Sequence, residues 1–145
     1  MDQWWGFLDG LKEALPGFLI GDATATSDAC FRCAVYSHQA LVETPSRFIV
    51  VGCMSILAPS YTVYGVEYEG PKREWGKIRL CLEPLPTQMR LPAEVISRNI
   101  EATFGVSALP RDIAQTPIPL YVEPQEPPHT TLFHALFTAT PTSLP

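Results

Sequence analysis

The stretch RFIVVGCMSILAPSYTVYGVEYE, residues Arg47–Glu69, contains two predicted strands separated by a turn. Phe48–Leu57 is almost continuously apolar, which is typical of a central strand covered on both faces. Tyr61–Glu69 is rich in aromatic and β-branched residues, and Pro59-Ser60 favours a tight connection between the two strands. Because short connections join neighbouring antiparallel strands, this stretch predicts a domain built on an antiparallel sheet.

The rest of the chain adds helices and further strands. Apolar residues at helical spacing predict helices over residues 3–15 and 91–104. Pro92 suits the first turn of the second helix, and Gly105 suits its left-handed C-cap. Further strands are expected at Cys30–Tyr36, Lys77–Glu83, Ile118–Glu123 and Thr130–Thr138. We therefore expect an α+β fold, an antiparallel β-sheet of about four to six strands with one or two helices packed on one face.

Two local patterns predict which side chains are buried. In KIRLCLE, Lys77–Glu83, strict alternation predicts that the apolar side chains, Ile78, Leu80 and Leu82, point inward. Trp4 and Trp5 lie about 100° apart on the first predicted helix, so one is expected in the core and the other at its margin.

Length, charge and hydropathy limit the class of protein. A chain of 145 residues predicts a single domain, which we place at 1–139 with a flexible tail at 140–145. The net charge of −5 disfavours nucleic acid and fits a cationic protein partner. The apolar run Phe48–Ala58 is shorter than the roughly 20 residues that span a bilayer, and the N-terminus lacks the basic region of a signal peptide. These features predict no membrane association and a cytoplasmic protein.

The four cysteines are expected to be reduced and structural. Cys30-Phe31-Arg32-Cys33 is a C-x-x-C pattern, but it opens a predicted strand, where residues three apart point to opposite faces. A reactive thiolate needs a setting such as a helix N-terminus, and a zinc site needs a second ligand pair at similar spacing. We therefore expect neither a metal nor a cofactor.

The sequence favours a non-catalytic protein over an enzyme. It contains no nucleophile elbow, phosphate-binding loop or dinucleotide-binding motif. The remaining candidates for a small-molecule hydrolase or transferase are His38, Glu67 and Cys30. Such an enzyme predicts a deep pocket between sheet and helix where at least two of these side chains converge.

Charged residues gather around Trp75. The segment Glu67–Arg79, EYEGPKREWGKIR, holds four of the ten basic residues of the chain. An exposed tryptophan beside arginine is typical of an interface hot spot, whereas a tryptophan folded onto the sheet would be part of the core. A stacked phosphate or nucleobase is a further alternative. The predicted partner-binding residues are Glu67, Glu69, Arg73, Glu74, Trp75 and Glu83.

These observations together predict a small non-catalytic protein-binding domain that neutralises or masks a partner, such as a cationic toxin or effector. In size, acidity and strand content the chain is similar to the small toxin-neutralising immunity proteins of bacteria. The acidic groups would steer the partner, and Trp75 would anchor it. The alternatives are a secretion-chaperone-like protein that holds an extended client segment along its sheet, and the hydrolase or transferase described above.

Overall fold

The predicted strand pair forms the centre of the sheet. In the computed structural model, which describes residues 2–37, 46–69 and 78–144, strand β3 (Ser46–Ser55) pairs with β4 (Ser60–Glu69) in antiparallel register. Successive side chains of a strand point to opposite faces. Val50 and Val51 are both 0% exposed and belong to the cores on the two opposite faces. The prediction of a central strand covered on both faces is confirmed.

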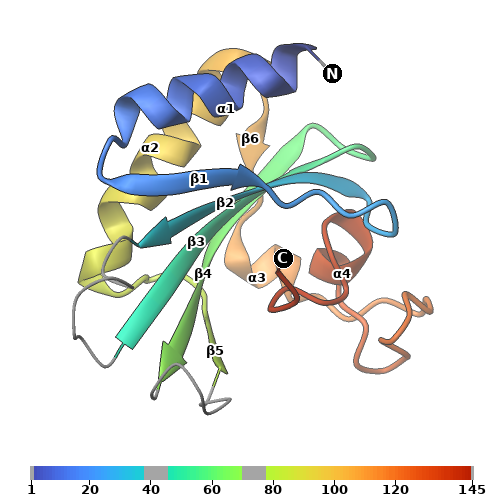
Figure 1. The fold of residues 1–145 in the computed structure, drawn as a ribbon. Helices are drawn as coiled ribbons and strands as arrows, with labels where there is room; N and C mark the ends of the chain where they lie inside the picture. Colours follow the sequence, from blue (N-terminus) through green and yellow to red (C-terminus); the bar gives the residue numbers. More distant parts are fainter. Residues whose placement is uncertain (1, 38–45, 70–77, 145) are drawn as a thin grey trace.

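The described part of the chain forms one six-stranded sheet with helices on its faces (Figure 1). The strand order is β1-β2-β3-β4-β5 with every neighbour antiparallel, and β6 runs parallel to the start of β4. The other strands are β1 (Phe18–Asp22), β2 (Cys30–Ser37), β5 (Ile78–Cys81) and β6 (Ser107–Ala108). The helices are α1 (Asp2–Ala14), α2 (Thr87–Phe104), α3 (Arg111–Ala114) and α4 (Leu132–Leu136). The predicted α+β class is confirmed.

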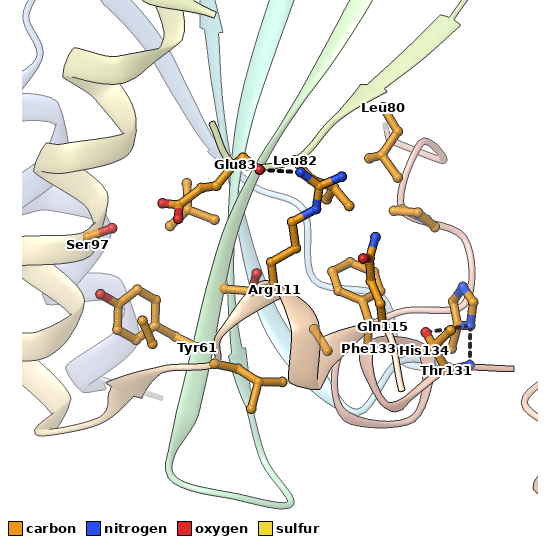
Figure 2. A pocket seen from close by; sticks show the side chains of 16 residues that line it. Tyr61, Leu80, Leu82, Glu83, Ser97, Arg111, Gln115, Thr131, Phe133 and His134 are labelled. Atoms are coloured by element: carbon orange, nitrogen blue, oxygen red, sulfur yellow. Dashed lines mark hydrogen bonds between the residues drawn. The ribbon is translucent and has the colours of Figure 1, made fainter. Parts of the chain in front are cut away.

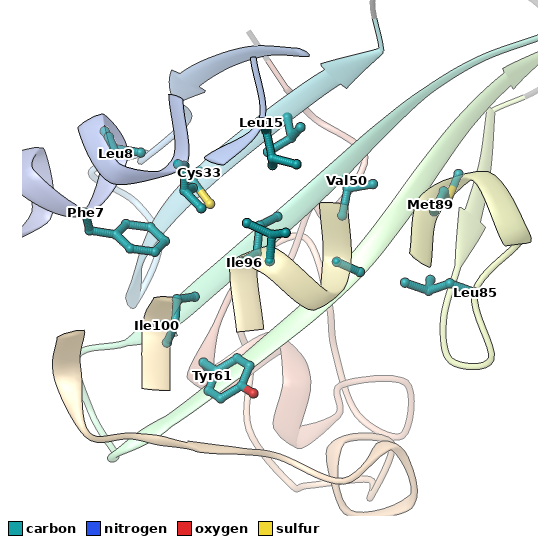
Figure 3. Packing of buried hydrophobic residues seen from close by; sticks show 14 of the residues in the cluster. Phe7, Leu8, Leu15, Cys33, Val50, Tyr61, Leu85, Met89, Ile96 and Ile100 are labelled. Atoms are coloured by element: carbon teal, nitrogen blue, oxygen red, sulfur yellow. The ribbon is translucent and has the colours of Figure 1, made fainter. Parts of the chain in front are cut away.

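Helices α1 and α2 pack together on one face of the sheet (Figure 1). Ile96 and Ile100 of α2 are fully buried against the strands (Figure 3). Trp4 of α1 is 3% exposed and donates its indole N–H to the Asp22 carboxylate over 3.1 Å. Trp5 is 48% exposed. The predicted division of this pair between core and margin is therefore confirmed.

Helix α2 begins earlier than the sequence predicted. It starts at Thr87, so Pro92 is not in the first turn but inside the helix, where its missing N–H leaves one intrahelical bond unmade. The C-terminal prediction is confirmed, because Gly105 adopts φ 66° and its N–H donates to the carbonyl of Glu101 over 3.0 Å. Only a residue that tolerates the left-handed region closes a helix in this way.

Helix α2 is also the longest helix of the described residues, at 18 residues. Its exposed side carries charged residues that include Arg90, Glu94 and Arg98. A membrane-spanning helix needs about 20 predominantly apolar residues. No helix in the described ranges is long and apolar enough to cross a membrane.

Gly52 lets α2 pack closely against β3. A Cβ atom at Gly52 would lie 2.6 Å from Cγ2 of Ile96 and 3.1 Å from Sγ of Cys33. Ile96 is β-branched and fully buried, so it has little freedom to move away. We expect Gly52→Ala to lower the free energy of unfolding by about 1–3 kcal/mol through overpacking, measured by urea denaturation. Gly21→Ala in strand β1 is the matched control, because a Cβ atom there would meet no heavy atom of the described residues within 4 Å. An equal or larger loss for the control would contradict this explanation.

The second face of the sheet is covered in part by α3, α4 and the C-terminal residues (Figure 1). Phe133 is 8% exposed and Phe137 is 0% exposed, and the two rings lie 5.6 Å apart. Phe133 also makes an edge contact with Tyr64 of β4, with ring centroids 5.7 Å apart. Helices therefore pack on both faces, whereas the sequence predicted them on one.

The strands predicted at Ile118–Glu123 and Thr130–Thr138 are wrong. The first range contributes only one isolated bridge, Val122 with Gln125, because the prolines in and around it remove N–H groups that a ladder requires. The second contains α4 instead. Its signal was present in the sequence: Phe133 and Phe137 recur at helical spacing, and Thr131 and His134 occupy the N-cap and N3 positions of a capping box.

The residues predicted as a C-terminal tail contact the sheet. Tyr64 donates its hydroxyl hydrogen to the carbonyl of Pro141 over 2.8 Å. Arg32 of β2 donates to the carbonyl of Ser143 over 3.0 Å. The division of the chain into one domain and a tail stays a prediction, but these bonds fasten residues 141 and 143 to the second face.

Candidate functional site

Four of the six predicted partner-binding residues lie wholly or partly outside the described residues. Arg73, Glu74 and Trp75 belong to the range 70–77. His38, a candidate of the enzyme hypothesis rather than a partner-binding residue, belongs to the range 38–45, which also lies outside the described residues. Glu69 ends β4, and its side chain is not among those described. The roles predicted for these residues stay predictions.

Glu67, one of the predicted partner-binding residues, is largely buried in an ion pair. Its side chain is 11% exposed, and its carboxylate accepts a hydrogen bond from the Arg79 guanidinium over 2.6 Å. This bond raises the pKa of Arg79. The two residues face each other across β4 and β5, so the sheet register itself creates the ion pair. Glu67 therefore offers a partner little free charge.

Strand β5 is less buried than its alternation predicted. Ile78 is 45% exposed and Leu80 is 38% exposed, although both were expected to point into the core. They lie on the face of the sheet that carries α3 and α4. They are exposed because β5 has only four residues and lies at the edge of the sheet. The helices that cover this face, α3 and α4, are also short.

The backbone of β5 also faces outward at these two residues. In an antiparallel pair, alternate residues turn their backbone groups toward the partner strand. The carbonyl of Tyr61 accepts an N–H from the residue after β6, on the side of β4 where β5 also lies. Backbone groups alternate in direction along β4, so those of Glu67 point to the same side as those of Tyr61. They therefore point toward β5 and the register partner Arg79. The backbone groups of Ile78 and Leu80 therefore face away from the sheet, and no other described strand pairs with β5.

A pocket opens where the outer edge of β4 has no partner strand. The pairing of β6 with β4 ends at Tyr61, and the pairing of β5 begins at Gly65. Residues 62–64 therefore border a gap between the two strands in the described sheet. The pocket at this gap has a volume of about 290 Å³, and side chains from α2, α3 and α4 surround it (Figure 2).

The pocket wall is mostly apolar. Its apolar side chains include Val63, Leu80, Leu82, Leu109 and Phe133. They come from β4, from β5 and the residue after it, from the residue after β6, and from α4. Since these elements are far apart in sequence, no local pattern could have predicted the pocket.

Polar side chains also line the pocket. They include Ser97, Arg111, Gln115, Glu83 and His134 (Figure 2). Of the predicted partner-binding residues whose side chains the structure describes, Glu83 lines the pocket and Glu67 does not. A wider surface depression of about 690 Å³ adjoins the pocket and shares Ser97, Glu83 and Arg111 with it.

Arg111 is the cation of the pocket. It is exposed, and it donates a hydrogen bond from its guanidinium to the backbone carbonyl of Glu83. A guanidinium has five N–H donors, so this bond leaves most of them free. Among the described residues no carboxylate lies within ion-pair distance of Arg111.

His134 presents a neutral ring to the same pocket. Its Nδ1 atom accepts the backbone N–H of Thr131 over 2.9 Å. Burial lowers the pKa of His134, which favours the uncharged ring at neutral pH. A neutral histidine that accepts at Nδ1 carries its hydrogen on Nε2. His134 is therefore a hydrogen-bond donor at Nε2.

The enzyme hypothesis gains nothing from this pocket. It required two of His38, Glu67 and Cys30 to converge, but neither Glu67 nor Cys30 lines the cavity. Cys30 and Cys33 are buried in the cores of opposite faces, as residues three apart on a strand must be. Burial raises the pKa of Cys33 to about 12, so its thiol stays protonated. The described residues contain no cluster of metal-ligating side chains.

Comparison of this chain with protein-family models, with curated proteins and with solved structures found no match. Any inference about function therefore depends on the side chains of the chain itself. Two features stand out among the described residues: the exposed edge strand β5 and the pocket beside it.

Proposed function

We propose that this protein is a non-catalytic domain that binds an extended segment of a partner protein along β5 and thereby masks or neutralises the partner. The supporting observation is that β5 combines outward-facing backbone groups with the exposed apolar side chains of Ile78 and Leu80. A partner strand added to this edge would form main-chain hydrogen bonds and cover both side chains.

The chemistry of the edge favours this use. Natural edge strands are protected from pairing by short length, charged side chains, proline or a bulge. Strand β5 is short, at four residues, but its only charged residue is Arg79, which Glu67 neutralises over 2.6 Å. The edge therefore keeps the features that attract another strand.

Several of the predicted binding residues flank β5 in the sequence. Glu74 and Trp75 precede β5 in the chain, and Glu83 follows it. In the proposal these acidic groups steer a cationic partner, consistent with the net charge of −5, and Trp75 anchors it. We place this binding in the cytoplasm, where buried reduced cysteines such as those of this chain persist.

The test begins with affinity capture of a partner from the native organism and identification by mass spectrometry. The dissociation constant of the purified pair is then measured by calorimetry. We expect Ile78→Lys to weaken the complex at least about tenfold, because it places a charge on the edge and removes an apolar contact. Trp75→Ala should weaken it as well, and rising salt should slow association.

Leu120→Lys is the matched control, since Leu120 is 54% exposed but belongs to the segment between α3 and α4, outside β5. It should bind as the unmodified protein does. If Ile78→Lys binds its partner as tightly as Leu120→Lys, the β5 edge is not the binding site. A partner whose activity persists at saturation would rule out neutralisation.

A second candidate function shares the same observation. A secretion-chaperone-like protein also holds an extended client segment along a sheet, and the β5 edge fits that use. Such proteins are dimers, so light scattering at micromolar concentration distinguishes the two. A monomer would leave the masking function as the proposal.

A further inference from the structure

We propose that the pocket at the open edge of β4 binds a small organic anion: an apolar body of about ten non-hydrogen atoms that ends in a carboxylate held by Arg111. This site adjoins the protein-binding edge, and Leu80 and Glu83 contribute to both. The proposal depends on the size of the pocket, its apolar wall and the placement of its hydrogen-bond donors.

The volume sets the size of the ligand. Pockets for drug-sized ligands begin at about 300 Å³, and this one has about 290 Å³. A water-sized group occupies about 30 Å³ of liquid volume, so about ten such groups fit. A medium-chain fatty acid or a phenyl-substituted propionic acid has this size.

The wall selects an apolar body. Leu82, Leu109 and Phe133 form part of the surface that such a body would contact. Each is a side chain that the fold leaves facing the gap beside β4, because no strand fills the edge at residues 62–64. A ligand of matching shape would remove this apolar surface from water, at about 25 cal/mol for each Å².

The polar groups select a negative head group. Arg111 is a cation with unused N–H donors and no described carboxylate partner. Guanidinium and carboxylate match in geometry and form paired, charge-assisted hydrogen bonds. His134 and Gln115 also line the pocket, and they have further donors at Nε2 and in the side-chain amide. The nearby acid is Glu83, which lies beyond ion-pair distance of Arg111 and disfavours a ligand with more than one negative charge.

The test measures binding of octanoate and 3-phenylpropionate to the full chain by calorimetry, and maps their contacts by methyl NMR. We expect at least one of the two to bind, with shifts at Leu80, Leu82 and Leu109. Arg111→Gln should weaken that acid at least about tenfold, because hydrogen bonds to charged groups are the stronger class. The neutral amide of the same acid should bind weakly to both proteins.

Two variants serve as controls. Arg98→Gln makes the same change on the exposed side of α2, outside the pocket, and should leave binding unchanged. Ile78→Lys should also leave it unchanged, which separates this site from the protein-binding edge. The amide spectrum of each variant establishes that it is folded.

Three results would overturn the proposal. The first is that neither acid binds. The second is binding with shifts elsewhere, for example at the exposed Ile56 and Leu57 of the β3–β4 turn. The third is that the acid and its amide bind with equal affinity, or that Arg111→Gln and Arg98→Gln bind the acid with equal affinity. Either result would show that Arg111 does not hold a carboxylate.

Discussion

Arg32→Met is expected to lower the free energy of unfolding by about 3–5 kcal/mol, because it leaves a buried charge without its partner. The Arg32 side chain is 3% exposed and lies 3.8 Å from the carboxylate of Asp28, which is 8% exposed. Arg32 also donates to the carbonyls of Ala23 and Ser143, over 2.9 and 3.0 Å. Methionine has a similar volume but satisfies none of these groups.

The measurement is denaturation by guanidinium chloride, with Arg98→Met as the control. Arg98 forms an ion pair with Glu94 over 3.7 Å, but both side chains are 65% exposed, so its loss should change stability by less than about 0.5 kcal/mol. The double variant Asp28→Leu/Arg32→Met should be more stable than Arg32→Met alone, because it removes the unpaired carboxylate. Equal losses for Arg32→Met and Arg98→Met would contradict the buried ion pair.

Phe137→Ala is expected to lower the free energy of unfolding by about 3–5 kcal/mol, the usual effect of removing a fully buried aromatic ring. Phe137 is 0% exposed and packs against Phe133 with ring centroids 5.6 Å apart. It lies in the proline-rich C-terminal third of the chain, where the sequence predicted strands rather than a core helix. The size of the loss therefore tests whether this third belongs to the cooperative core.

Tyr121→Ala is the matched control for Phe137→Ala. It also removes an aromatic ring from the C-terminal third, but Tyr121 is 79% exposed, so we expect a change of less than about 0.5 kcal/mol. Both variants are compared by thermal and urea denaturation. Should Phe137→Ala be as stable as Tyr121→Ala, the C-terminal residues would not be part of the folded core.

The N-terminal two thirds of the chain were largely predictable because their signals are local. The apolar run at Phe48–Leu57 and the alternation at Tyr61–Glu69 describe strands that the sheet contains. The C-cap of α2 at Gly105 was predictable because glycine tolerates the positive φ that this position requires. These signals depend on side chains that are close in sequence, and the fold retains them.

The C-terminal third was not predictable in the same way. Its prolines disfavour a regular ladder, and the helical signal of the five-residue α4 is limited to the spacing of Phe133 and Phe137 and one capping box. Burial of Arg32 was likewise invisible, because its partners include Ser143, which is distant in sequence. Such contacts exist only after the sheet has formed.

By itself, therefore, the sequence determined the class of fold, the central strands, the α2 cap and the opposite orientation of Cys30 and Cys33, since each follows from the period of a strand or a helix. Only the tertiary structure decided the pairing of Glu67 with Arg79, the exposure of β5 and the pocket around Arg111. The reason is physical: these features depend on strand order and on a gap in the edge of β4, which bring together residues that the sequence keeps apart.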